Sequence, residues 1–169
     1  MDILFENNYI LTIDHFLEIC KRLVNKRFKV CCDLYIVFLF GIIIWSFSPN
    51  ISLVWEIAYF ILIVISIILR FNLYKISAKK SYEQQEAFNN YQPLEQSIYF
   101  YDDNFKLIAI NGGKSIFSYE RIKKIYETNN FLILNIENKI TVSVKKDGFN
   151  KGNYNDFKKF ISNKSNIKI

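Results

Sequence analysis

Two long apolar runs in the first half of the chain predict two helices that cross a membrane. They cover residues 31–47 and 51–69, inside a segment, residues 30–70, that we assign to a transmembrane hairpin. A bilayer core about 30 Å thick needs roughly 20 helical residues at 1.5 Å each, so each run is long enough to span it. Neither run has the regularly spaced polar positions that are typical of a helix on the surface of a soluble domain.

The segment Ser46–Asn50, with the sequence SFSPN, separates the two runs and predicts a tight turn. Proline cannot continue the first helix, and Ser and Asn are common at helix ends. Basic residues flank the hairpin on its open side, and the turn has none: Lys21, Arg22, Lys26, Arg27, Lys29, Arg70, Lys75, Lys79 and Lys80. The positive-inside rule therefore predicts a protein of the cell membrane with two spans and with both termini in the cytoplasm.

The segments that flank the hairpin predict one strand and two helices. Residues 1–29 predict an extended stretch followed by an amphipathic helix, which begins after Thr12 as N-cap and runs into the first span. His15, the only histidine in the chain, is expected at the surface or in a packing role. Residues 71–92 contain neither Gly nor Pro and predict a juxtamembrane continuation of the second helix, which Pro93 ends.

The hydrophobic period changes in the last part of the chain, residues 93–169. Short apolar stretches separated by turn residues predict six antiparallel strands, at 97–103, 105–111, 114–119, 122–128, 131–138 and 140–146. A final helix follows, with Tyr154, Phe157, Phe160 and Ile161 on one face. We expect an α+β protein in which a small antiparallel β-barrel or bent sheet is capped by this helix. The N-terminal extended stretch is a candidate seventh strand.

Residues from Ser97 to Lys164 resemble the YcxB-like C-terminal domain, a bacterial family with a pleckstrin-homology-like appearance. The resemblance lies in an aspartate-containing turn after the first strand, the block SYERIKKIYET, an apolar strand, and a corner rich in lysine and phenylalanine before the last helix. The family's usual order of parts also matches the whole chain. One departure is Val144 before Lys145, where members often carry proline. The resemblance implies a pleckstrin-homology-like fold and no catalytic residues.

Composition and motifs argue against several kinds of site. The net charge is +6, but a chain rich in Ile, Asn, Lys, Phe and Tyr is typical of an AT-rich genome, so its basicity does not indicate a nucleic-acid partner. The cysteines Cys20, Cys31 and Cys32 lack the spacing of zinc ligands and are expected to be reduced. The stretch NGGKS lacks the spacing of a phosphate-binding loop. We expect no enzymatic activity, no cofactor, no metal and no nucleic-acid partner.

The sequence leaves three functions open. The first is a membrane-anchored interaction or regulatory module that binds a protein partner, with a protective, immunity-type role as one version; a homo-oligomer is a separate possibility, and self-association alone would count against a partner. The second is recognition of anionic lipid headgroups, with Lys123, Lys124, Lys145 and Lys146 facing the lipid. The third is a small transport or signalling component that uses Glu56, because a carboxylate inside a membrane span is a functional candidate.

Overall fold

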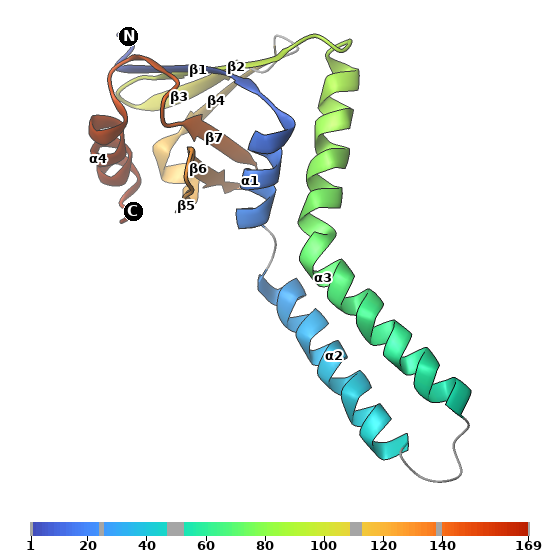
Figure 1. Ribbon diagram of the computed structural model, residues 1–169. Coiled ribbons are helices and arrows are strands. Elements are labelled where there is room, and N and C mark those ends of the chain that lie inside the picture. Colours follow the sequence, from blue (N-terminus) through green and yellow to red (C-terminus); the bar gives the residue numbers. More distant parts are fainter. Residues whose placement is uncertain (1, 24–25, 47–52, 109–112, 138–139, 169) are drawn as a thin grey trace.

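The computed structural model describes residues 2–23, 26–46, 53–108, 113–137 and 140–168, and of residues 26–28, 46, 53 and 56 it describes the backbone alone. The predicted SFSPN turn lies outside the described residues except for the backbone of Ser46. The elements in chain order (Figure 1) are β1 Phe5–Leu11, α1 Ile13–Leu23, α2 Lys26–Ser46, α3 Leu53–Phe88, β2 Leu94–Phe100, β3 Asn104–Ile108, β4 Lys114–Ser118, the 3-10 turn η1 Tyr119–Arg121, β5 Ile122–Glu127, β6 Phe131–Ile136, β7 Thr141–Lys145, β8 Phe149–Lys151 and α4 Tyr154–Ser165.

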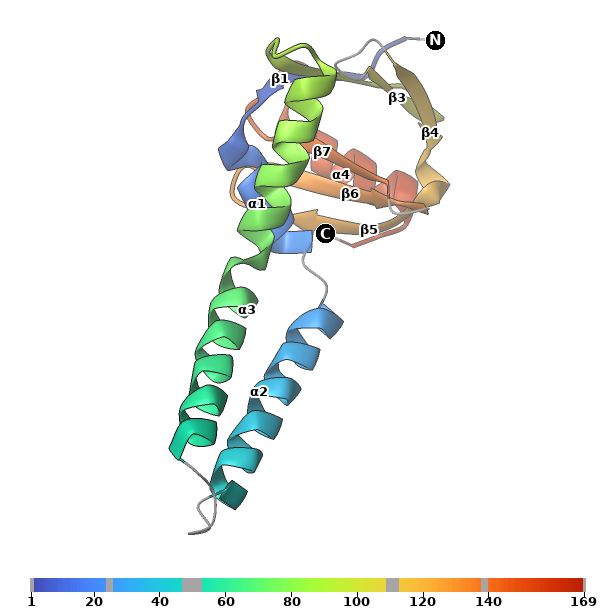
Figure 2. The ribbon, with the colours of Figure 1, turned by 90° about the vertical axis from the view of Figure 1, so that its right-hand side faces the viewer.

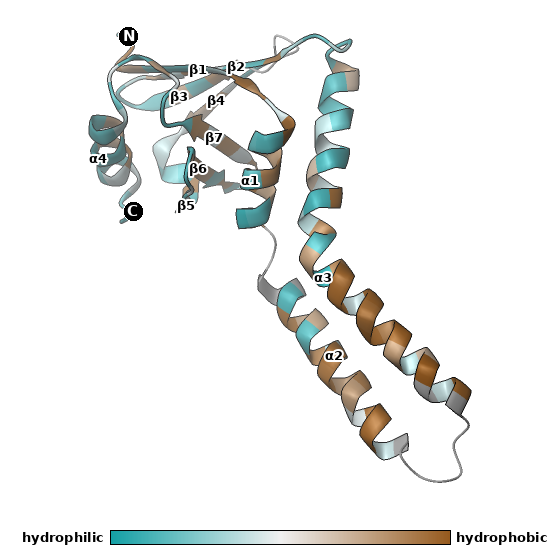
Figure 3. Cartoon of the chain, in the orientation of Figure 1, coloured by the Kyte–Doolittle hydropathy of each residue, from teal (hydrophilic) through white to brown (hydrophobic). Residues whose placement is uncertain are grey.

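Helices α2 and α3 run side by side in opposite directions and extend away from the strands (Figures 1 and 2). Their apolar residues gather in the part that is remote from the strands (Figure 3). Among the described residues, one helical segment, Ile57–Phe88, is long and apolar enough to cross a membrane, and only 6% of its most apolar stretch is buried. Length and composition thus support membrane association.

Helix α3 is continuous for 36 residues, which confirms the predicted extension of the second apolar run. It ends at Phe88, before the predicted stop at Pro93. The reason is local: Asn90 and Tyr91 take left-handed backbone conformations, with φ of 51° and 58°, and such residues cannot continue a right-handed helix. The Asn89 side chain then donates to the carbonyl groups of Gln92 and Pro93, both at 3.0 Å.

The strands form two antiparallel sheets and do not close into the barrel that the sequence suggested. The larger sheet has the order β4-β3-β2-β1-β8, and the smaller one has the order β5-β6-β7. All six predicted strands are present, and the short β8 is an addition. Closure fails because the chain passes from β4 to β5 through η1, and no described strand pairing joins the two sheets. The two sheets and α4 are called the sheet part below.

The N-terminal strand is an integral member of the larger sheet. Strand β1 pairs with β2 along its whole length, from Phe5 opposite Phe100 to Leu11 opposite Leu94. It also pairs with β8 on its other side. The extended N-terminal stretch therefore joins β2 and β8, which come more than 80 residues later in the chain, after the two long helices, as the seventh-strand hypothesis proposed.

Strand β6 is buried on both faces, which explains its continuously apolar sequence. Leu132 and Leu134 belong to the core between the two sheets, whereas Phe131 and Ile133 belong to a second core under α1 and α3. Side chains alternate between the faces of a strand, so a strand covered on both faces needs apolar residues at every position.

The two faces of the smaller sheet are covered by different helices. Helix α4 packs on one face, and α1 with the polar half of α3 packs on the other (Figures 1 and 2). On α4, Phe157 and Ile161 are fully buried, and Tyr154 and Phe160 pack against the same core. The predicted apolar face of the last helix is confirmed.

A candidate ligand pocket between the helices and the sheets

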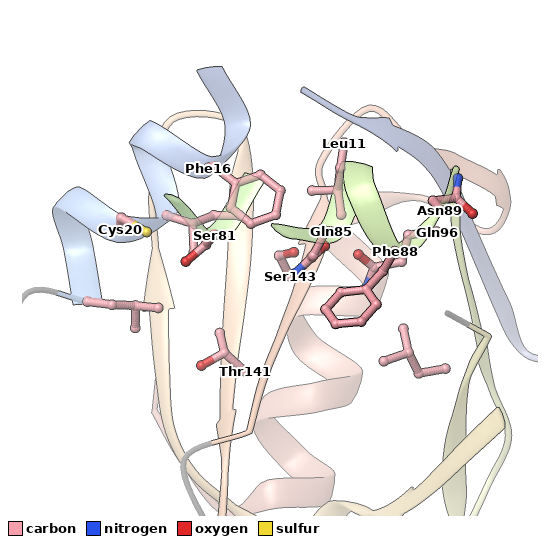
Figure 4. Close-up of a pocket in the computed structure, with 13 residues that line it drawn as sticks. Leu11, Phe16, Cys20, Ser81, Gln85, Phe88, Asn89, Gln96, Thr141 and Ser143 are labelled. Atoms are coloured by element: carbon pink, nitrogen blue, oxygen red, sulfur yellow. The ribbon is translucent and has the colours of Figure 1, made fainter. Parts of the chain in front are cut away.

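A pocket of about 630 Å³ lies where α1 and the polar half of α3 meet β2, β3 and β7 (Figure 4). Pockets of roughly 300–1,000 Å³ are the usual size for small ligands. Its apolar lining consists of Leu11, Phe16, Ile19, Cys20, Leu23, Phe88 and Leu107. Its polar lining consists of Ser81, Gln85, Asn89, Gln96, Thr141 and Ser143. All of these lining residues are uncharged.

Helical periodicity places the lining residues of α1 and α3 on facing sides. On α1, Phe16, Ile19, Cys20 and Leu23 recur at spacings of three and four residues, so one stripe of the helix faces the pocket. On α3, Ser81 and Gln85 are four residues apart, and Asn89 follows just beyond the helix end. The α1 wall of the pocket is therefore apolar, whereas the α3 side combines amides and a hydroxyl with the ring of Phe88.

A buried polar cluster of Tyr9, Gln96 and Ser143 forms part of the pocket wall. The Tyr9 hydroxyl lies 2.6 Å from the Ser143 carbonyl oxygen, 2.7 Å from Ser143 Oγ and 3.1 Å from Gln96 Oε1. Burial raises the pKa of Tyr9 far above its usual range, and the hydrogen bond with Ser143 offsets only part of this effect. The hydroxyl therefore stays protonated and fixes the positions of the Gln96 and Ser143 side chains.

The pocket offers one thiol and no strong nucleophile among its described residues. Burial raises the pKa of the half-buried Cys20 thiol, so the reactive thiolate is disfavoured. His15 lies close by, with its ring 4.9 Å from that of Phe131, and its pKa is lowered by burial and then by the charge of Lys145. His15 packs on the sheet part, in agreement with the packing role expected for it.

The four lysines predicted to face lipid form two separate pairs. Lys123 and Lys124 lie near the start of β5, whereas Lys145 and Lys146 lie at the end of β7. Lys124 is opposite Asn135 and Lys145 is opposite Phe131, so the two pairs are about 13 Å apart along the sheet at 3.3 Å per residue.

Three of these lysines already have carboxylate partners. Lys123 Nζ lies 2.7 Å from Glu137, Lys145 Nζ lies 3.2 Å from Asp147, and Lys146 Nζ lies 2.8 Å from Glu127. These ion pairs partly neutralise the positive charge that was expected to attract lipid.

Glu127 is the centre of an ion cluster that sequence reasoning missed. It accepts hydrogen bonds from Lys146 Nζ at 2.8 Å, Tyr154 Oη at 2.7 Å and Lys158 Nζ at 2.6 Å. These donors, first the two lysines and then the tyrosine, lower the pKa of Glu127 to about 2. The cluster ties α4 to the smaller sheet, so its function is structural.

The remaining predicted site residue, Glu56, has its backbone in α3, but its side chain lies outside the described residues. Within the part of the chain that the structure describes, no group of three or more His, Cys, Asp or Glu side chains is placed to hold a metal ion. The uncharged pocket is therefore the best-defined candidate site in these segments.

Comparison with known proteins gives a family match within the C-terminal part of the chain. No curated protein and no solved structure matches the chain. A family model described as "YcxB-like protein" matches residues 100–161, a range that runs from the end of β2 into α4. Over residues 100–161 the match confirms the resemblance to the YcxB-like family found in the sequence.

Proposed function

We propose that this protein is a membrane-anchored, non-enzymatic interaction module that presents its sheet part to a protein partner in the cytoplasm. The observation that carries this proposal is the course of α3. One unbroken helix contains an exposed apolar segment and a polar segment that packs on the sheet part. The resemblance further implies that the sheet part has a pleckstrin-homology-like fold, and two sheets with a C-terminal helix at one end are consistent with it.

Two contacts of α1 fix the sheet part to the helix that anchors it. The rings of Phe16 on α1 and Tyr82 on α3 lie 5.6 Å apart. At the other side of α1, the Glu18 carboxylate accepts from the backbone and side-chain nitrogens of Asn130, both at 2.8 Å, in the turn between β5 and β6. The anchor and the sheet part therefore behave as one body.

Strand pairing supports two spans with both termini on one side. Strand β1 precedes α2 and α3, and its partner β2 follows them. If α3 alone crossed the bilayer, β1 and β2 would lie on opposite sides and would be unable to pair. An even number of crossings is required between these strands, and α2 is the helix available for the second. The basic residues outside the turn favour the cytoplasm for the sheet part.

Strand β4 is the edge best suited to a partner strand. It pairs only with β3 in its sheet, and Ile116 at its centre is 64% exposed. The other edges are less open, since β8 has three residues, β5 carries Lys123 and Lys124, which discourage strand addition, and β7 is bonded by side chains of β1. An exposed edge with an apolar side chain favours recognition of an extended segment of another protein.

The partner hypothesis is tested by crosslinking in intact cells. A photoreactive amino acid at Ser115 on β4 should give an adduct with one distinct protein, and the Ile116→Lys substitution should abolish that adduct. The same amino acid at Lys159, which is exposed on α4, is the control position and should give no such adduct. Adducts only with a second copy of the chain would contradict a separate partner.

The membrane topology is tested independently. We expect the full chain to stay with membranes after alkaline carbonate extraction. A reporter that is active only in the cytoplasm should be active at either terminus and inactive when inserted between residues 48 and 49. Activity of the inserted reporter would contradict the two-span arrangement.

The alternative of anionic headgroup recognition has less support. A lipid phosphate would have to displace the carboxylates from Lys123, Lys145 and Lys146, and the two lysine pairs do not form one patch. Binding of the full chain to anionic vesicles that is lost on Lys123→Glu with Lys124→Glu would revive this alternative.

A further inference from the structure

We propose that the pocket between α1, α3 and the sheets binds an uncharged amphipathic molecule from the bilayer, with its apolar chain along α1 and a hydroxyl- or amide-bearing head beside Gln96 and Ser143. This site is separate from the β4 edge and adds a small-molecule ligand to the proposed protein-binding role. Three features of the pocket support this ligand: the chemistry of its lining, its apolar α1 wall, and its position relative to α2 and the apolar part of α3.

The described lining of the pocket carries no charge. Charged residues make up 22% of the chain, and α1 itself carries Asp14, Glu18, Lys21 and Arg22. The face of α1 that lines the pocket carries none of them. An ionised headgroup would lose its hydration there without gaining a counter-ion, so the lining discriminates against charged ligands.

The apolar wall of the pocket runs along α1 toward the start of α2. Between Phe16 and Leu23 the wall extends about 10 Å along α1, at 1.5 Å per residue. Leu23 is the last residue of α1, at the end from which the chain continues to α2 (Figure 1). The apolar wall therefore points toward the segment that we propose to be embedded in the bilayer, which makes the bilayer the natural source of the ligand.

A fixed set of neutral hydrogen-bonding groups lines another part of the pocket. Gln96 and Ser143 are 9% and 6% exposed, and the Tyr9 hydroxyl holds both of them. Gln85 on α3 and Asn89 just beyond its end contribute two further amides (Figure 4). Amides and hydroxyls donate and accept without carrying charge, which suits a glycerol-like or amide head.

Photolabelling of the full chain in phosphatidylcholine nanodiscs tests this proposal. One probe is a monoacylglycerol with a diazirine in its chain, and the other is the fatty acid with the same chain and diazirine. We expect the monoacylglycerol to label residues 16–23 and 81–89 about three- to tenfold more than the fatty acid does. Both probes should label α2 and the apolar part of α3 equally.

A matched pair of variants tests the charge argument. Gln85→Lys places a cation at the pocket, and Gln84→Lys places the same cation on an exposed neighbouring position outside the lining. We expect Gln85→Lys to shift labelling at residues 16–23 toward the fatty acid and Gln84→Lys to leave the preference unchanged. Gln85→Trp, which fills the pocket, should reduce labelling by both probes.

Three results would overturn the proposal: equal labelling of residues 16–23 by both probes, labelling confined to α2 and the apolar part of α3, or the same shift from Gln84→Lys as from Gln85→Lys. Crosslinking at Ser115 is measured separately, so loss of pocket labelling with an intact partner adduct contradicts this inference alone.

Discussion

The side chain of Asn7 pairs with the backbone of Lys145 as a neighbouring strand would. Asn7 Nδ2 donates to the Lys145 carbonyl oxygen at 2.8 Å, and the Lys145 amide donates to Asn7 Oδ1 at 3.1 Å. Asn7 is fully buried. It lies on β1 of the larger sheet, whereas Lys145 ends β7 of the smaller one. One amide side chain thus links two sheets that share no strand pairing in the described residues.

Replacing Asn7 with alanine should destabilise the protein because it leaves both backbone groups of Lys145 without this partner. We expect the free energy of unfolding to fall by about 2–3 kcal/mol, and the Lys145 amide to exchange hydrogen faster. Chemical unfolding of the full chain in micelles measures the first effect, and hydrogen exchange measures the second.

The adjacent Asn8 provides a matched control for this substitution. Its Nδ2 donates to Glu6 Oε1 at 2.8 Å, a contact within β1 that joins no other element. Asn8→Ala should therefore cost less than about 1 kcal/mol and leave exchange at Lys145 unchanged. Equal losses for the two variants would mean that Asn7 does not link the sheets.

Gly152 is a second position where one residue type is required. Its φ is +82°, and a Cβ atom there would lie 2.4 Å from Cδ1 of Phe5. Phe5 packs against Phe157 of α4 with ring centroids 5.5 Å apart, so it has little room to move. Gly152→Ala should lower the free energy of unfolding by about 2 kcal/mol or more, measured by chemical unfolding.

Gly41 is the control for this prediction. It lies in α2, and a Cβ atom there would meet nothing within 4 Å. Gly41→Ala should leave stability unchanged or raise it slightly, because alanine favours a helix. A similar loss at both glycines would show that backbone conformation at Gly152 is not the cause.

Local patterns were sufficient to predict most elements of this fold. Short apolar stretches located the strand that contains the buried Val142 and Val144, and helical spacing located Phe157 and Ile161 on the buried face of α4. These features depend on residues that are near each other in the sequence. The YcxB-like family was recognised for the same reason, because its motifs are contiguous.

The arrangement of the sheets and the pocket was not predictable because it depends on contacts between distant residues. The sheets separate at η1, where the Tyr119 hydroxyl donates to the carbonyl of Tyr101, 18 positions earlier, at 2.6 Å. Leu11 and Ser143 line one pocket although 132 positions separate them. No spacing rule applied to a single sequence can predict that two such distant residues line the same pocket.

The ion cluster at Glu127 predicts a loss of stability in acid. Its carboxyl has a pKa of about 2 when folded and about 4.3 when unfolded. The stabilisation is therefore present above about pH 4.3 and disappears as the pH falls toward 2. Since the side chain is about a third exposed, solvent screens the cluster, and we expect about 0.5–1 kcal/mol at neutral pH.

Glu127→Gln tests this pH dependence. The difference in free energy of unfolding between the unsubstituted protein and the variant should shrink as the pH falls from 4.5 to 2. Glu120→Gln, at an exposed acid in η1, is the control. A difference at Glu127 that stays constant over this range would contradict a pKa lowered by Lys146 and Lys158.

The two long helices are joined by a bidentate ion pair at the border of their apolar segments. Arg70 Nε and Nη2 on α3 donate to the two carboxylate oxygens of Asp33 on α2, the second at 3.0 Å. A double-mutant cycle with Asp33→Asn and Arg70→Gln should give a favourable coupling energy in thermal unfolding of the full chain in nanodiscs.

An ion pair within one helix, which should couple more weakly, is the comparison for this double-mutant cycle. Lys79 and Glu83 are four residues apart on α3, exposed, and 3.7 Å from each other, so their coupling should stay below about 0.5 kcal/mol. In the charge-exchanged protein, Asp33→Arg with Arg70→Asp, most of the lost stability should return. Additive effects of the single substitutions would mean that α2 and α3 are held together by apolar packing alone.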